Sequence, residues 1–151
     1  TAVAHCPSKF HIPPKFDPTL RIMGWKALGK EVDALFQTMP DTRNVLIFSD
    51  AYQVSSLLAF YMKGHPVTYC VNLGRRMNQY DLWPSMKGFI HSDGIFVTID
   101  DKELPVKIRD AFDRCEKHLF QVYEKGRLLR EYPIFTCHNF KGLKEELTGE
   151  F

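Results

Sequence analysis

The sequence predicts a three-layer α/β domain, with a mostly parallel, Rossmann-like sheet, helices on both faces and an antiparallel hairpin at one edge. Two runs that are apolar at every or nearly every position, Val45 to Phe48 and Gly94 to Ile99, have the pattern of strands that are buried on both faces. Segments with helical spacing of apolar residues precede and follow these runs. Because strands and helices alternate along the chain, the α/β class is favoured.

The first helix is expected over residues 17–38. Asp17 or Thr19 would cap it, and Pro18 suits its first turn. Gly24 and Gly29 fall inside this helix, where a glycine costs about 1 kcal/mol against alanine. We therefore expect another backbone to pack closely against the helix at these positions.

A strand, a helix and a second strand follow. The run 52–62 has helical spacing and ends before Gly64, and residues 66–71 form a short strand. Such a unit is expected to be a right-handed parallel crossover. Further along, residues 104–112 predict a short helix, and two strand-like runs, 115–123 and 128–137, flank a turn and predict the edge hairpin.

The length of 151 residues fits one domain, which we place at residues 17–140. Residues 1–16 are rich in proline and aperiodic, as expected of a connector, and residues 141–151 form a charged tail. Twenty basic and eighteen acidic residues give a net charge of +2, which argues against a nucleic-acid partner. No apolar run approaches the roughly 20 residues that a membrane-spanning helix needs.

The four cysteines form no CxxC pair, which argues against a zinc site. Cys70 and Cys115 lie in strand-like contexts typical of small buried side chains. Cys115 and Cys137 can also pair across the hairpin, and the sequence leaves this choice open. The histidines show no metal-binding spacing, so we expect no metal.

No nucleotide cofactor is expected, because the turn after the first buried strand lacks the glycines that let a pyrophosphate approach the backbone. That turn contains Asp50 and Tyr52. Asp50 has a purely structural interpretation, in which its carboxylate caps the helix that follows. We find no complete catalytic motif in the chain.

The candidate binding site combines Asp50 and Tyr52 with a loop after the second strand. The carboxyl ends of parallel strands meet at one edge of a sheet, where ligands bind. Aromatic rings stack on sugar faces, and amides read hydroxyl groups. The proposed binding residues of this loop are Arg76, Asn78, Gln79, Tyr80, Asp81 and Trp83.

This loop has structural interpretations as well. Asp81 can pair with Arg75 or Arg76 and order the loop, and Trp83 can fill the core. Alternatively, Asp50 and Asp81 can face one cleft as two carboxylates that act on a sugar hydroxyl.

Four motifs carry a resemblance to a known family. Asp17-Pro18-Thr19 precedes Gly24-Trp25, and Ser49-Asp50-Ala51-Tyr52-Gln53 precedes Leu58-Ala59-Phe60-Tyr61. Arg76 to Trp83 reads RMNQYDLW, and Phe140-Lys141-Gly142 closes the set. Together they resemble the soluble C-terminal domain of bacterial membrane glycosyltransferases of the dolichyl-phosphate-mannose–protein mannosyltransferase-like family, which is related to the aminoarabinose lipid A transferases.

The resemblance implies a domain on the periplasmic side of the inner membrane, joined to a membrane-spanning part of the same polypeptide. Such enzymes transfer a sugar from a polyprenyl-phosphate carrier, and their catalytic carboxylate lies in the membrane part. The domain would then help to bind or orient the donor, a glycan acceptor or a partner, and would be inactive alone. The alternative is a free-standing soluble α/β enzyme or carbohydrate-binding module, with its site near Asp50 and Asp81.

Overall fold

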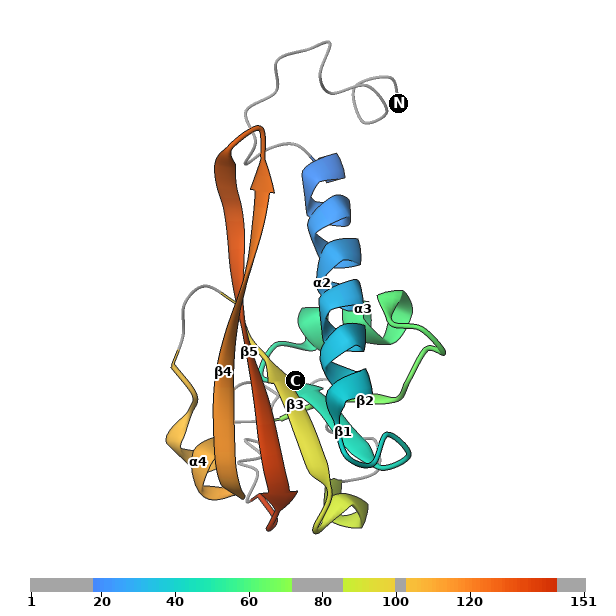
Figure 1. Ribbon diagram of the computed structural model, residues 1–151, viewed down its shortest axis with the longest axis vertical. Helices are drawn as coiled ribbons and strands as arrows, with labels where there is room; N and C mark the ends of the chain where they lie inside the picture. Colours follow the sequence, from blue (N-terminus) through green and yellow to red (C-terminus); the bar gives the residue numbers. More distant parts are fainter. Residues whose placement is uncertain (1–17, 72–85, 100–102, 144–151) are drawn as a thin grey trace, which may run out of the picture.

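The computed structural model describes residues 18–71, 86–99 and 103–143, which form one five-stranded mixed sheet with helices packed on it (Figure 1). The strand order is β2-β1-β3-β5-β4. The strands are β1 (Val45–Ser49), β2 (Thr68–Cys70), β3 (Asp93–Val97), β4 (Phe112–Glu124) and β5 (Arg127–Phe140). The helices are α2 (Pro18–Thr38), α3 (Tyr52–Tyr61) and α4 (Val106–Asp110), with a 3-10 turn, η4, at Met86–Phe89.

The sheet has a parallel part and an antiparallel part. Strand β1 pairs in parallel with β2 and with β3, and β5 pairs antiparallel with β3 and with β4. The α/β class, the parallel β1–β3 pair and the edge hairpin are confirmed. The hairpin strands are longer than the sequence predicts, and α4 is shorter than the expected helix at residues 104–112.

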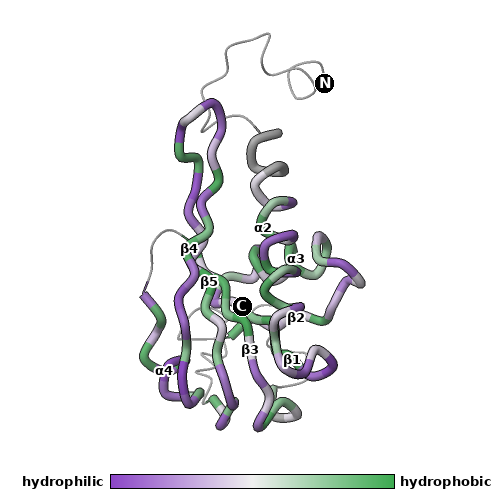
Figure 2. The backbone as a smooth tube through the Cα atoms, in the orientation of Figure 1, coloured by the Kyte–Doolittle hydropathy of each residue, from purple (hydrophilic) through white to green (hydrophobic). Residues whose placement is uncertain are grey.

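Both faces of the central strands are buried, as the two apolar runs predict. Every residue of β1 is buried, and so are the last four of β3. On one face, Val45, Ile47 and Ile95 pack with residues of α2 and α3. On the other face, Phe48 and Phe96 pack with α4, η4 and the start of β4. Figure 2 shows the alternation of hydrophilic and hydrophobic residues along the hairpin.

The two glycines inside α2 have different surroundings. A side chain at Gly29 would meet the Cβ of Tyr61 at 2.8 Å and its backbone carbonyl at 3.1 Å, so α2 and α3 approach each other closely there. A side chain at Gly24 would meet its nearest neighbour, Val122, at an ordinary 3.8 Å. The expected close approach is therefore confirmed at Gly29 and wrong at Gly24.

This difference predicts opposite effects of alanine at the two positions. Gly29→Ala should lower the free energy of unfolding, because overpacking costs about 1–3 kcal/mol and outweighs the gain in helix propensity. Gly24→Ala should leave it unchanged or raise it by up to about 1 kcal/mol. Urea unfolding of both variants measures the two effects. Equal shifts of the same sign would contradict the close contact between α2 and α3.

Candidate functional site

The carboxyl ends of the three parallel strands lie together at one edge of the sheet. Ser49, the last residue of β1, is in register with Cys70 of β2 and with Val97 of β3. The backbone N–H of Val71 donates to the carbonyl oxygen of Ser49 at 2.9 Å, which extends this pairing beyond β2. The residues that follow each strand therefore start from one edge, as the sequence predicts.

Asp50 is fixed at this edge by a residue from another strand. The hydroxyl of Thr98, which follows β3 and is buried, donates to Oδ1 of Asp50 at 3.0 Å. The expected capping role of Asp50 is wrong, because Ala51 is the N-cap of α3 and, within the described part of the chain, no side chain donates or accepts a cap hydrogen bond there. The hydroxyl of Ser49 instead accepts a hydrogen bond from the N–H of Ala51 at 3.1 Å.

Tyr52 begins α3 at the same edge and is 47% exposed, so its ring is available for contact with a ligand. The other predicted site residues lie outside the described residues; they are Arg76, Asn78, Gln79, Tyr80, Asp81 and Trp83. The predicted pairing of Asp81 with Arg75 or Arg76 and the predicted core role of Trp83 fall on the same segment. Their convergence with Asp50 and Tyr52 stays a prediction. Val71, the last described residue before that loop, lies at the edge where Asp50 lies.

Two buried hydroxyls that the sequence reasoning missed hold α3 against β2. Ser55 Oγ donates to the carbonyl oxygen of Tyr69 at 2.6 Å, and Thr68 Oγ1 donates to the carbonyl oxygen of Ser55 at 2.7 Å. Both side chains are buried and each has its hydrogen bond, so neither is a site residue. They fix the helix that carries Tyr52. In the sequence, Ser55 is a small polar residue on the apolar side of a predicted helix, and this feature could have indicated that its hydroxyl is buried.

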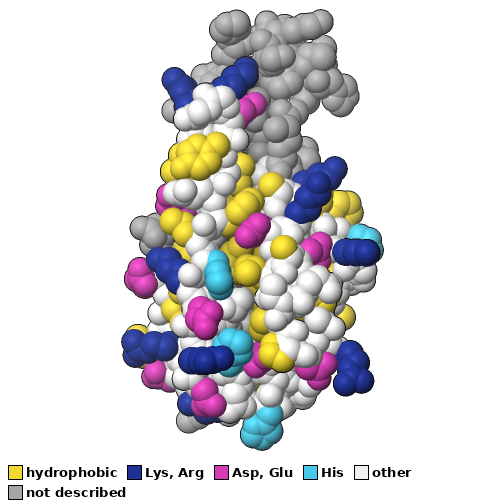
Figure 3. Space-filling view, viewed as in Figure 1, with side chains coloured by type: hydrophobic (Ala, Val, Ile, Leu, Met, Phe, Trp, Pro, Cys, Tyr) yellow, Lys and Arg dark blue, Asp and Glu magenta, His cyan; other side chains and the backbone are white. Residues whose placement is uncertain are grey.

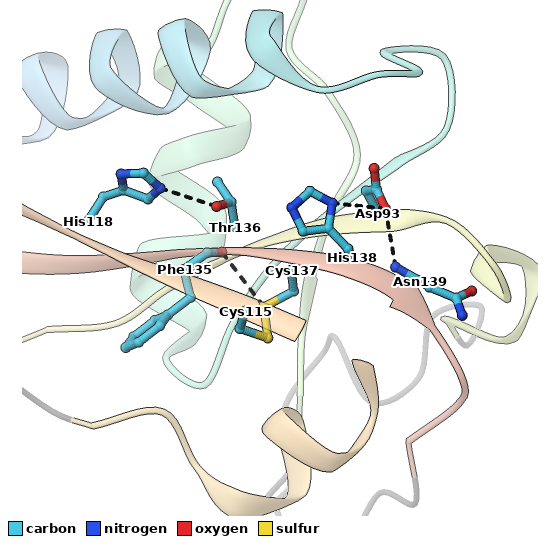
Figure 4. Close-up of a disulfide and its surroundings, with 8 residues drawn as sticks. All are labelled: Asp93, Cys115, His118, Phe135, Thr136, Cys137, His138 and Asn139. Atoms are coloured by element: carbon cyan, nitrogen blue, oxygen red, sulfur yellow. Dashed lines mark hydrogen bonds and ion pairs between the residues drawn. A yellow bond between two sulfur atoms is a disulfide. The ribbon is translucent and has the colours of Figure 1, made fainter. Parts of the chain in front are cut away.

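A second polar cluster lies at the opposite, amino end of β3, and Figure 4 shows part of it. Oδ1 of Asp93 accepts the backbone N–H of Asn139 at 3.1 Å and lies 3.5 Å from Nδ1 of His138. His91 Nδ1 lies 3.2 Å from the side-chain oxygen of Asn139. Because that amide oxygen can only accept, Nδ1 of His91 is the donor. His91 and Asn139 both have positive φ, 69° and 59°.

A cavity of about 180 Å³ lies beside this cluster. Its lining includes Ser92, whose buried hydroxyl has no hydrogen-bond partner in the described part of the chain. The full lining is Pro40, Asp41, Asn44, Ile90, His91, Ser92 and Asp93. Its lining comes from two short segments, 40–44 and 90–93, that only the fold brings together, so the sequence alone did not indicate it.

Asp113 extends the cluster on the edge strand. Its Oδ2 accepts the side-chain N–H of Asn139 at 2.6 Å, and its Oδ1 lies 3.6 Å from Lys141 Nζ. The hydrogen bond from Asn139 and then the charge of Lys141 hold the pKa of Asp113 below its ordinary value of 3.8. The folded state therefore favours the ionised carboxylate.

This lowered pKa predicts a pH-dependent contribution to stability. A depressed pKa stabilises the fold above the ordinary value of 3.8, and this stabilisation is lost as the pH falls through the lower folded-state pKa. The difference in unfolding free energy between the wild type and Asp113→Asn should shrink as the solution is acidified. Urea unfolding over an acid pH series measures it. A constant difference would contradict the pairing with Asn139. The effect should be small, because the Asp113 side chain is exposed and solvent screens its interactions.

The structure joins Cys115 and Cys137 in a disulfide between directly paired positions of β4 and β5 (Figure 4). Cys137 is completely buried and Cys115 is half-buried. The choice that the sequence left open is thus resolved in favour of the pair. The interpretation of Cys70 as a small buried side chain is confirmed. Among the described residues, no group of three or more His, Cys, Asp or Glu side chains is placed to hold a metal ion.

Comparison with protein-family models, with curated proteins and with solved structures finds no match to this chain. In the described part of the chain, no helix has the length and apolar character that crossing a membrane requires.

Proposed function

We propose that this chain is the extracytoplasmic C-terminal domain of a polyprenyl-phosphate-sugar-dependent membrane glycosyltransferase of the mannosyltransferase-like family. The observation that carries the proposal is the position of Asp50. The motif Ser49-Asp50-Ala51-Tyr52-Gln53 lies where three parallel strands end, and Thr98 fixes its carboxylate there. The chain then leaves β2 at the same edge to enter the second motif, which begins at Arg76.

Three of the predicted site residues have a chemical role in the proposal. The carboxylate of Asp50 accepts hydrogen bonds from sugar hydroxyls, and the exposed ring of Tyr52 contacts the apolar face of a sugar. Arg76 pairs with the phosphate of the lipid carrier or with another anionic group. The domain binds or orients donor, acceptor or partner, and the chemical step belongs to the membrane part.

The packing supports a Rossmann-like, three-layer arrangement, which we propose as the finer description of the fold. Helices α2 and α3 pack on one face of the parallel strands, and α4 and η4 pack on the other. The disulfide supports a location on the periplasmic side of the inner membrane, because disulfides persist in oxidising compartments and are rare in the cytosol.

The test is sugar transfer by membranes that contain the protein expressed from its complete reading frame. Asp50→Asn should reduce transfer roughly tenfold to a hundredfold, because a lost hydrogen bond to a charged group costs about 1.5–3 kcal/mol. Asparagine keeps an oxygen that accepts from Thr98, so the fold should persist. Arg76→Ala should have a similar effect on transfer.

The control is Asp110→Asn, which makes the same change at an exposed position of α4. It should leave transfer per folded molecule at the wild-type level. If Asp50→Asn lowers only the melting temperature, the binding role is wrong.

The complete reading frame also separates the proposal from a free-standing enzyme or carbohydrate-binding module. Membrane spans in it support the glycosyltransferase domain, and their absence supports the free-standing protein. Transfer by the 151-residue chain alone would also contradict the proposal.

A further inference from the structure

The β4–β5 hairpin projects well beyond the rest of the sheet (Figure 1). Strand β3 pairs with β5 only from Cys137 back to Ile134. In the earlier part of β5, from Pro133 to Arg127, the strand is paired with β4 and has no β3 partner. The turn is tight, because Lys125 and Gly126 both have positive φ, 47° and 76°, as a two-residue hairpin loop requires.

Helix α2 begins at the same end of the molecule as this turn (Figure 1). The position of Gly24, early in α2, lies against Val122, which is close to the turn. The chain therefore enters the described fold beside the projecting end of the hairpin. Helix α4, η4 and the amino ends of β1 and β3 lie toward the other end (Figure 1).

The projecting end combines exposed apolar and basic side chains, and we call Tyr123, Lys125, Arg127 and Leu128 the hairpin tip. Tyr123 is 57% exposed and Leu128 is 46% exposed, and the two are directly paired across the strands. Lys125 and Arg127 are exposed between them. Figure 3 shows basic side chains at this end of the hairpin, with an acidic side chain beside them and hydrophobic side chains below them. Glu124 pairs with Arg127 across the turn, and Lys125 and Arg127 together leave this end with a net positive charge.

We propose that the hairpin tip docks on the anionic phospholipid surface of a membrane. Basic side chains near such a surface attract its phosphates, and a tyrosine is typical of the boundary between headgroups and acyl chains. The orientation rests on the proposed function: if a membrane-spanning part precedes α2, the chain enters the domain from the bilayer side, and the hairpin tip faces that bilayer. The edge that carries Asp50 would then be held at a fixed height above the lipid.

The test is flotation of the purified chain with vesicles. It should float with vesicles of phosphatidylcholine mixed with phosphatidylglycerol, and much less with vesicles of phosphatidylcholine alone. Binding should weaken as salt is raised, because salt screens the attraction between exposed charges. The double variant Lys125→Gln/Arg127→Gln should bind roughly 30-fold more weakly, which corresponds to about 1 kcal/mol for each basic residue. Tyr123→Ser should weaken binding without changing its salt dependence.

The matched control is Lys107→Gln/Arg109→Gln on α4, which removes a lysine and an arginine with the same spacing at the far end of the molecule. It should bind as the wild type does. Equal weakening by both double variants would show attraction by overall charge and would overturn the proposal, as would no flotation even at low salt.

The experiments distinguish failure of the membrane-docking proposal from failure of the proposed function. A reading frame without membrane spans removes the glycosyltransferase assignment, and the vesicle result is measured independently of it. Absence of vesicle binding removes the docking surface and leaves the transfer assay on Asp50 to decide the function.

Discussion

Replacing Phe48 by alanine is expected to lower the free energy of unfolding by about 3–5 kcal/mol, since it removes a large, fully buried ring. Phe48 is 1% exposed, and its ring centroid lies 5.1 Å from that of Phe96 and 5.9 Å from that of Phe112. A Cβ at Gly94 would come within 3.2 Å of both Phe48 and Phe112, so the packing around this ring is dense. The neighbouring side chains can therefore fill only part of the cavity that the alanine substitution leaves. Urea unfolding followed by circular dichroism measures the loss.

The control is Phe60→Ala, which removes the same ring from a position that is 66% exposed. It should change stability by much less than Phe48→Ala, because little of its ring leaves water on folding. Similar losses for both variants would contradict the described packing of this core. Phe48 also lies two residues before Asp50, so the loss of its ring should loosen the end of β1.

The apolar runs predicted the parallel strands because burial on both faces leaves a simple pattern in the sequence. Val45 to Phe48 has no polar residue, and its strand pairs on both sides. The hairpin strands were predicted too short because their ends carry polar residues. Asp113, Arg114 and Asn139 look like loop residues, but they lie within β4 and β5, where the ladder continues past them to the pair Phe112 and Phe140.

The position of Asp50 at the end of a buried strand was predicted, but its hydrogen-bond partner was not. The end of a buried strand marks the edge where Asp50 lies, so its general location follows from the sequence. Its partner Thr98 is 48 positions away, and it was predicted only as part of a buried strand. The polar cluster around Asp93 was missed for the same reason, since His138 and Asn139 reach Asp93 only through the pairing of β5 with β3.

The disulfide is the feature that ties the fold most directly to the proposed compartment. Cys115 and Cys137 are separated by 22 positions and join the edge strand to its neighbour. Closing a loop of this size is expected to contribute about 3 kcal/mol to stability. The double variant Cys115→Ala/Cys137→Ala should lose about this much and still fold, because the β4–β5 ladder remains. Unfolding with and without a reductant measures the contribution.

The double variant is the control for effects of the reductant that do not involve the disulfide. Its free energy of unfolding should be the same with and without the reductant. The wild type should lose stability on reduction and approach that of the double variant. In the cell, thiols blocked at lysis should leave Cys115 and Cys137 unmodified and linked, because an oxidising compartment keeps the pair closed. Recovery of both cysteines as blocked thiols would place the protein in a reducing compartment. Such a result would contradict the periplasmic location and, with it, the proposed place of this domain beside a polyprenyl-phosphate donor.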